Sequence, residues 1–177
     1  MRAKAAFVFL LMAVAMRGTA FSQNKHSQEQ TQFSAEDETV KSPVPIPDDA
    51  WAILKAERYV QNVLESVNLT PDLLPRSWFS AAIVHLHGDK EKDLIVMAEG
   101  EMTGGNISPF WVFLDTPQGM KLVLNTSAHD VSIKHSQWHG YRVIEFSGAT
   151  CCEISRTWLR YENGEYRDYR HSTKGIK

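Results

Sequence analysis

Apolar positions recur at two different periods, and the change of period separates a helical segment from a strand-rich segment. Between residues 48 and 67, apolar side chains recur at steps of three and four residues, which places them on one stripe of a helix. The stripe consists of Ile53, Ala56, Val60, Val63, Leu64 and Val67. Asp48 or Asp49 can cap the start, and Pro71 follows the end. The pattern predicts one amphipathic helix of about 18 residues.

Beyond this helix, short apolar runs alternate with turn residues, which predicts strands. The expected hairpins pair FSAAIVHLH with DLIVMA, FWVFL with MKLVLN, VSIKH with YRVIEFS, and EISRTWLRY with YRDYR. Asn163-Gly164 in the last turn is the strongest short hairpin signal. Short connections favour antiparallel neighbours. We therefore expect an α+β fold, with the N-terminal helix packed on an antiparallel β-meander of about eight short strands that is strongly twisted or split into two layers.

One strand, FWVFL, is apolar on both faces. Alternation places Phe110, Val112 and Leu114 on one face, and Trp111 and Phe113 on the other. This strand is therefore expected at the centre of a sheet or between two layers.

The N-terminal 47 residues have a different composition from the rest of the chain. Residues 1–22 combine Arg2 and Lys4, a short apolar run and small residues, which is the order of a secretory signal peptide. An uncleaved anchor is the alternative. Residues 23–47 are polar and end in a proline-containing stretch, so we expect a disordered spacer. Residues 48–177 then form a single globular domain, and the protein is secreted or periplasmic.

Charge narrows the range of partners. The chain has 19 basic and 21 acidic residues, and removal of the signal peptide takes away three basic ones, which leaves a net charge of −5. A mildly acidic chain lacks the basic surplus that phosphate backbones require. We therefore expect no nucleic-acid partner, and no stable membrane insertion once the signal peptide is cleaved.

The stretch VHLHGDKEKDLIV, residues 84–96, resembles the calcium loop of FG-GAP and VCBS-type repeats. In those families the loop holds Ca²⁺ within β-propeller blades. The resemblance places His85 and His87 where the first two ligands belong. It matches Asp89 and Asp93 to the later acidic ligands.

The loop departs from that pattern at the ligands themselves. Ca²⁺ requires about six to eight oxygen ligands, whereas two imidazoles replace oxygens here and Lys90 replaces the turn glycine. We interpret the stretch as a hairpin that has lost the ion. His85 and His87 share a strand face, so Zn²⁺ or Cu²⁺ is the alternative. A third ligand would have to come from Asp89, Asp93, His129, His135 or His139.

Two further segments have the composition of binding surfaces. Residues 100–113 join a flexible Gly-Gly turn to aromatic side chains, and residues 136–142 gather aromatic residues and an arginine around a turn. The candidate binding residues are Gly104, Gly105, Asn106 and Trp111 in the first segment, and Trp138, His139 and Tyr141 in the second. Turns that feed core strands, or that close the ends of a small β domain, are the alternatives. Residues 100–113 also resemble small uncharacterised bacterial secreted proteins, a resemblance that implies no function.

Cys151 and Cys152 are the only cysteines, and they are adjacent. Export exposes them to oxidising conditions, so a vicinal disulfide, two free thiols and bridges between chains all stay open. We find no motif of a hydrolase nucleophile, zinc protease, P-loop or dinucleotide fold, and expect no cofactor. The sequence favours a non-catalytic binding domain for a protein or envelope ligand, of the size and charge of an inhibitor or immunity-type protein. A metal-binding protein or enzyme that uses His85 and His87, and a structural envelope component, are the alternatives.

Overall fold

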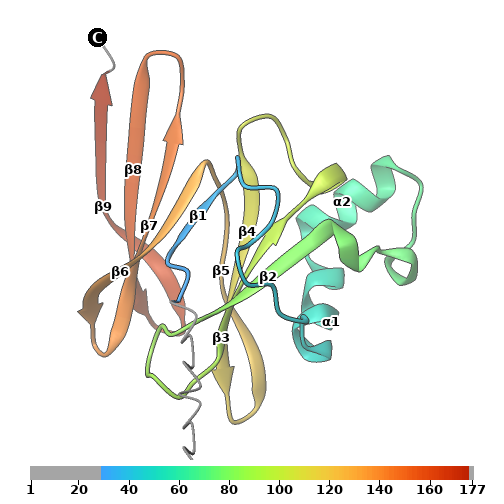
Figure 1. The fold of residues 1–177 in the computed structure, drawn as a ribbon, viewed down its shortest axis with the longest axis horizontal. Coiled ribbons are helices and arrows are strands. Elements are labelled where there is room, and N and C mark those ends of the chain that lie inside the picture. The colour runs from blue at the N-terminus through green and yellow to red at the C-terminus, as the bar shows by residue number, and fades with distance from the viewer. Residues whose placement is uncertain (1–28, 176–177) are drawn as a thin grey trace, which may run out of the picture.

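A computed structural model of the chain describes residues 29–175. The expected signal peptide lies outside the described residues. The chain folds into two antiparallel sheets and two short helices (Figure 1). The strands are β1 (Gln32–Ser34), β2 (Phe79–Val84), β3 (Asp93–Ala98), β4 (Ser108–Thr116), β5 (Gly119–Ala128), β6 (Asp130–Trp138), β7 (Tyr141–Ala149), β8 (Glu153–Glu162) and β9 (Glu165–Gly175). The helices are α1 (Asp48–Ala56) and α2 (Arg58–Ser66), and short 3₁₀ turns cover Pro71–Leu73, Arg76–Trp78 and Gly100–Met102.

The expected α+β fold, one N-terminal helix packed on a meander, is wrong, because the described residues are mostly strand and form two antiparallel sheets with two short helices. One sheet has the order β2-β3-β4-β5, and the other has the order β1-β6-β7-β8-β9. The chain changes sheets at His129, the single residue between β5 and β6. Since no long loop marks this change, the sequence has no signal that distinguishes it from an ordinary strand connection. The four expected hairpins nevertheless form, as β2–β3, β4–β5, β6–β7 and β8–β9.

The expected single helix is also two helices. Glu57 has an extended backbone (φ −64°, ψ 135°) and separates α1 from α2. Its carboxylate accepts a hydrogen bond from the Asn125 side chain on β5. The break allows Leu54 of α1 and Leu64 of α2 to bury their side chains against the same twisted sheet.

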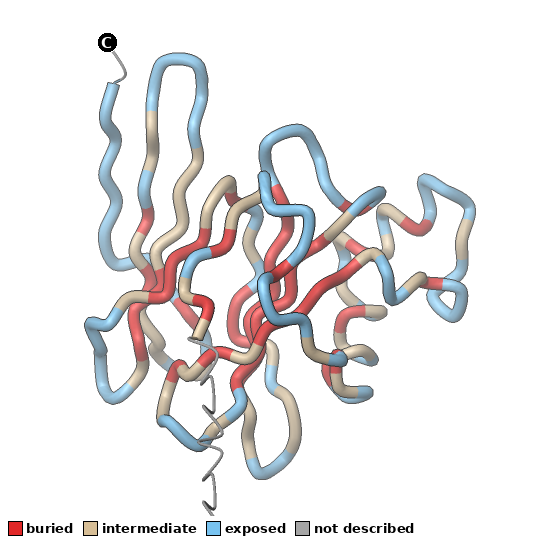
Figure 2. Tube along the Cα trace, viewed as in Figure 1, coloured by how far each residue is buried: buried red, intermediate tan, exposed pale blue. Residues whose placement is uncertain are grey.

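The four-stranded sheet is covered on both faces. All six residues of β3 are buried, and the alternation expected for β4 is confirmed. Phe110, Val112 and Leu114 pack between the two sheets, whereas Trp111 and Phe113 pack beneath the helices. Figure 2 shows buried residues concentrated where these layers meet.

The expected disordered spacer is ordered from residue 29 onward. Residues 29–47, which we call the N-terminal strap, run from one sheet to the other. Phe33 pairs with Val131 of β6, and the Val44 amide donates to the Ala81 carbonyl oxygen of β2 at 2.8 Å. Few apolar residues are present, but Phe33 and Val40 are almost wholly buried in the core between the sheets. Composition averaged over the segment hides these two anchors.

Replacing Phe33 with Ala is expected to destabilise the protein by about 3–5 kcal/mol, because the change leaves a cavity between the sheets. The matched control is Glu38→Ala, which removes an exposed side chain from the same strap. Urea unfolding of both variants measures the difference. Equal stability of the two variants would show that the strap does not contribute to the core.

Candidate functional site

A fully buried carboxylate organises the loop between β2 and β3. Asp93 Oδ1 accepts a hydrogen bond from the Asp115 amide at 2.9 Å, and Oδ2 accepts one from the Leu86 amide at 2.8 Å. His87 Nδ1 lies 2.9 Å from the same Oδ2. A buried charge is tolerated only when such partners satisfy it. Asp93 therefore fixes the loop to β4 and orients the His87 ring.

The His87 ring begins a stack of aromatic side chains. It lies parallel to the Tyr141 ring (centroids 5.4 Å apart, 11° between planes), and Tyr141 stacks on Tyr161 at 4.1 Å. Tyr161 then meets the edge of Tyr166 at 5.6 Å. Burial raises the pKa of Tyr141, and the neighbouring Tyr161 and the Asp93 carboxylate raise it further. The stack joins the loop of one sheet to three strands of the other.

The Tyr141–Tyr161 pair lies between two hollows. The larger, about 580 Å³, is lined by Ile53, His87, Leu114–Leu122, Tyr141 and Tyr161. The smaller, about 420 Å³, is lined by His139, Tyr141, Tyr161, Glu162 and Asn163. Both volumes are within the range of small-ligand sites. Because other rings cover both faces of Tyr141, this pair offers ring edges and hydroxyl groups rather than a flat surface for stacking.

A partly buried ion pair between Arg142 and Glu29 holds the strap against this region. Arg142 Nη1 lies 2.9 Å from both carboxylate oxygens of Glu29, and Arg142 Nε donates to the Lys134 carbonyl oxygen at 2.8 Å. Glu29 also accepts a hydrogen bond from the His85 amide at 2.8 Å. Such charge-assisted hydrogen bonds are stronger than neutral ones. Arg142 and Glu29 thus connect β6, β7, the strap and the loop after β2.

The five-stranded sheet carries a second cluster close to the smaller hollow, which His139 and Glu162 line. The Arg160 guanidinium lies 4.5 Å from the centre of the Trp138 ring and 5.3 Å from that of Tyr169. One step along the same strands, Arg170 lies 4.6 Å from the centre of the Trp158 ring. Trp138 and Tyr169 are 39% and 43% exposed. We call Trp138, Trp158, Arg160, Tyr169 and Arg170 the arginine–aromatic face.

Only some of the predicted binding residues come together. Trp138, His139 and Tyr141 meet at the turn between β6 and β7, where the Trp138 and His139 rings are 4.7 Å apart. Trp111, by contrast, is wholly buried beneath the helices, so its assignment to a binding surface is wrong. Its side chain packs in the core between β4 and the helices.

The other candidates of that segment form an exposed turn. Gly104, Gly105 and Asn106 are exposed, and a bridge between Gly104 and Ile107 closes the turn. Gly105 has a φ of 60°, which glycine adopts without strain. None of these three residues lines either of the two hollows beside Tyr141.

The metal candidates of the loop do not converge. His85 Nδ1 lies 2.8 Å from the Glu91 carbonyl oxygen, and His87 Nδ1 is bound to Asp93. Asp89 is exposed. Within residues 29–175, no three His, Cys, Asp or Glu side chains are arranged to hold a metal ion. His87 and Asp93 instead form a pair that supports the aromatic stack.

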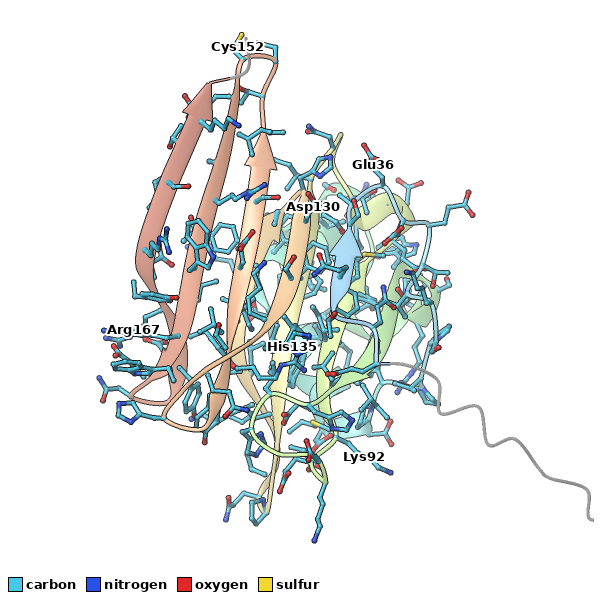
Figure 3. The ribbon with its side chains drawn as sticks, turned by 60° about the vertical axis from the view of Figure 1, so that its left-hand side comes forward. Glu36, Lys92, Asp130, His135, Cys152 and Arg167 are labelled. Carbon is cyan, nitrogen blue, oxygen red and sulfur yellow. The ribbon has the colours of Figure 1, made fainter. Side chains whose placement is uncertain are left out.

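Sequence reasoning found only Trp138 among the five members of the arginine–aromatic face, and missed Trp158, Arg160, Tyr169 and Arg170. A signal for them is present around the turn at Asn163-Gly164. This turn fixes the β8–β9 register and sets Arg160 opposite Arg167. Tyr169 lies two residues after Arg167. The β8–β9 register shifts at this point, so that Trp158 lies opposite Arg170. Figure 3 shows Arg167 on the outer side of β9.

The chain was compared with protein-family models, curated proteins and solved structures, and none of these matches it. Among residues 29–175, no helix has the length and apolar character needed to cross a membrane.

Replacing Asp93 with Ala is expected to destabilise the protein by about 1–3 kcal/mol for each amide left without a partner, those of Leu86 and Asp115. Asp89→Ala is the matched control, because Asp89 lies in the same loop but is exposed. Thermal unfolding compares the two. A small effect of Asp93→Ala, equal to that of the control, would contradict the role given to the buried carboxylate.

Stability is expected to fall above pH 10, because burial raises the pKa of Tyr166 well above its usual value of 10.0. Below that pH the phenol is neutral in both states. Above it the unfolded chain loses the proton more readily, so the contribution to stability is lost as pH rises. Tyr166→Phe should cost about 0.5–1.5 kcal/mol at neutral pH, through the lost bond to the Arg142 carbonyl oxygen.

Tyr166→Phe should also lose less stability than the wild type above pH 10, because it has no phenol to ionise at this position. Urea unfolding at a series of pH values measures this difference. Tyr169→Phe, which changes an exposed tyrosine on the same strand, is the control. If Tyr166→Phe loses as much stability above pH 10 as the wild type, a group other than Tyr166 causes the loss.

Proposed function

We propose that this protein is a non-catalytic binding domain that acts outside the cytoplasm, and that its arginine–aromatic face binds an acidic surface of a protein partner. The observation that supports this function is the position of Arg160 between two partly exposed rings, Trp138 and Tyr169. Trp, Tyr and Arg are the residues most enriched at the energetic centres of protein interfaces.

The two rings prepare Arg160 for binding. A free arginine side chain loses rotational entropy when a partner immobilises it, and this loss weakens binding. Here the rings already restrict the guanidinium through cation–π contacts. Glu162 Oε1 lies 2.7 Å from Arg160 Nε, and a guanidinium has further N–H donors that can bind a carboxylate. Arg160 therefore loses part of its rotational entropy when the protein folds, and less is lost when the partner binds.

The charge of this face differs from the charge of the whole chain. The face contains Arg160 and Arg170 and no acidic residue, whereas acids outnumber bases in the chain. The β8–β9 hairpin as a whole is nearly neutral, with five basic side chains beside Glu153, Glu162, Glu165 and Asp168. No acidic side chain lies within 4.0 Å of the Arg170 guanidinium among the described residues. An arginine without an acidic neighbour favours an acidic partner, because complementary charge accelerates association.

The shape of the face favours a protein over a small ligand. β9 has 11 residues, lies at the edge of its sheet and is exposed along almost its whole length. An exposed edge strand leaves backbone donors and acceptors available to an added strand. An inhibitor or immunity-type protein would use a surface of this kind.

The two alternatives receive less support from these side chains. A metal-dependent function needs a third ligand near His85 and His87, and the described residues place none there. A purely structural component needs no exposed aromatic cluster, whereas Trp138 and Tyr169 are both more than one third exposed.

Arg160→Ala is expected to weaken partner binding by at least about 30-fold, the equivalent of the roughly 2 kcal/mol that defines an interface hot spot. The test immobilises the exported protein and captures acidic proteins from the envelope and medium of its own cells. Wild type, Arg160→Ala and the control Arg58→Ala, an exposed arginine on α2, are compared at low and high salt. Wild type and the control should capture the same partner, more strongly at low salt. Equal capture by Arg160→Ala would contradict the proposal.

A further inference from the structure

The chain's two thiols lie at the tip of the hairpin that joins β7 to β8. Cys151 and Cys152 occupy the two positions between Thr150 and Glu153, and the Thr150 amide donates to the Glu153 carbonyl oxygen at 2.8 Å. Both cysteines are exposed, and their Sγ atoms are 2.7 Å apart. Figure 3 shows Cys152 at the outer end of this hairpin, away from the body of the fold.

We propose that this turn is a thiol–disulfide exchange site, which a disulfide-bearing oxidant closes into a vicinal disulfide and a thiol reductant reopens. The chain has no other cysteine, so each thiol has one possible partner within the chain. The two sulfurs are already adjacent and unobstructed, which satisfies the requirement of exchange for access. This inference does not depend on the proposed binding face.

Covalent geometry makes such a bridge easy to reduce. The described peptide bonds are all trans, so the two Cα atoms are about 3.8 Å apart. Unstrained disulfides hold their Cα atoms about 4.4–6.8 Å apart, and deviation from this range makes the bond more reducible. A bridge between neighbours also closes almost no loop, so it adds little stability through chain entropy. The site is therefore suited to reversible chemistry rather than to stabilising the fold.

The backbone of this turn can change its conformation when the Cys151–Cys152 disulfide forms. The turns at His139-Gly140 and Asn163-Gly164 have positive φ at both positions, the conformation that matches the twist of a two-residue hairpin. Neither Cys151 nor Cys152 has a positive φ. The turn at Cys151 and Cys152 therefore does not have the backbone conformation that fits the twist of the hairpin. Because both cysteines are exposed, formation of the disulfide ring displaces no packed side chain.

The reaction balances without a metal or cofactor. One cysteine thiolate attacks a sulfur of the oxidant's disulfide, which forms a mixed disulfide and releases one thiol of the oxidant. The neighbouring thiolate then attacks the cysteine sulfur of that mixed disulfide and releases the second thiol. The protein loses two electrons and two protons, and the oxidant's disulfide is reduced to two thiols. Excess reduced thiol reverses both steps.

The test uses the full chain, reduced and then incubated with oxidised glutathione, trapped with N-ethylmaleimide and weighed as intact protein. The expected product is a monomer lighter by two hydrogens that takes up no maleimide. About a tenfold excess of reduced over oxidised glutathione should restore two maleimide-reactive thiols. Cys151→Ser and Cys152→Ser should each stop at a glutathione adduct, because the second thiol is absent. Their far-ultraviolet circular dichroism and melting temperature confirm that they fold.

Three results would overturn the proposal. Wild type that keeps two maleimide-reactive thiols, or stops at a glutathione adduct, would show that the ring does not close. A covalent dimer on a non-reducing gel would show that the cysteines join chains instead. A bridge that survives the excess of reduced glutathione would show a stable structural disulfide rather than an exchange site.

Discussion

The burial of the four-stranded sheet on both faces is the constraint from which the rest of the fold follows. β4 presents Trp111 and Phe113 on one face and Phe110 and Val112 on the other, and none of these side chains is exposed. A strand of this kind needs a layer on each side, because exposed aromatic area of that size would cost several kcal/mol. The helices supply one layer, and the second sheet with the strap supplies the other. The short crossing at His129 allows the second sheet to turn back directly onto the first.

The local pairings could be predicted from the sequence, because turn chemistry and alternation act between neighbouring segments. Asn163-Gly164 defines the β8–β9 hairpin, and the two apolar faces of β4 are visible from alternation alone. A split into two layers is one possibility from the sequence, but the sheet to which each strand belongs and the crossing at His129 could not be predicted, since they depend on which layers cover which face. The strap could not either: Phe33 and Val40 are two apolar side chains in a polar segment, and only their tertiary contacts show that they are anchors.

The candidate site shows the same division between local and long-range information. The grouping of Trp138, His139 and Tyr141 is local to one turn, and sequence reasoning found it. The stack of His87 on Tyr141 joins residues of different sheets, and the polar partners of Asp93 come from both sides of its own strand. In the sequence, His87 and Asp93 suggest ligands of an ion. In the fold, backbone amides occupy the carboxylate, so the same residues serve to orient a ring.

The exposed parts of the five-stranded sheet can carry functional side chains without loss of stability. Its inner face carries Ile133, Ile144 and Leu159 and meets the requirement to cover the other sheet. Its outer face and its far hairpin carry no such requirement, since exposed positions contribute little to stability. Arg160 lies on that outer face, against Trp138 and Tyr169. Cys152 lies at the tip of that hairpin (Figure 3). Arg160 therefore rests on strands that Ile144 and Leu159 anchor in the core, which is the arrangement that allows an exposed group to act with a defined geometry. The turn at Cys152 lies beyond this packing, so its shape can change without disturbing the core.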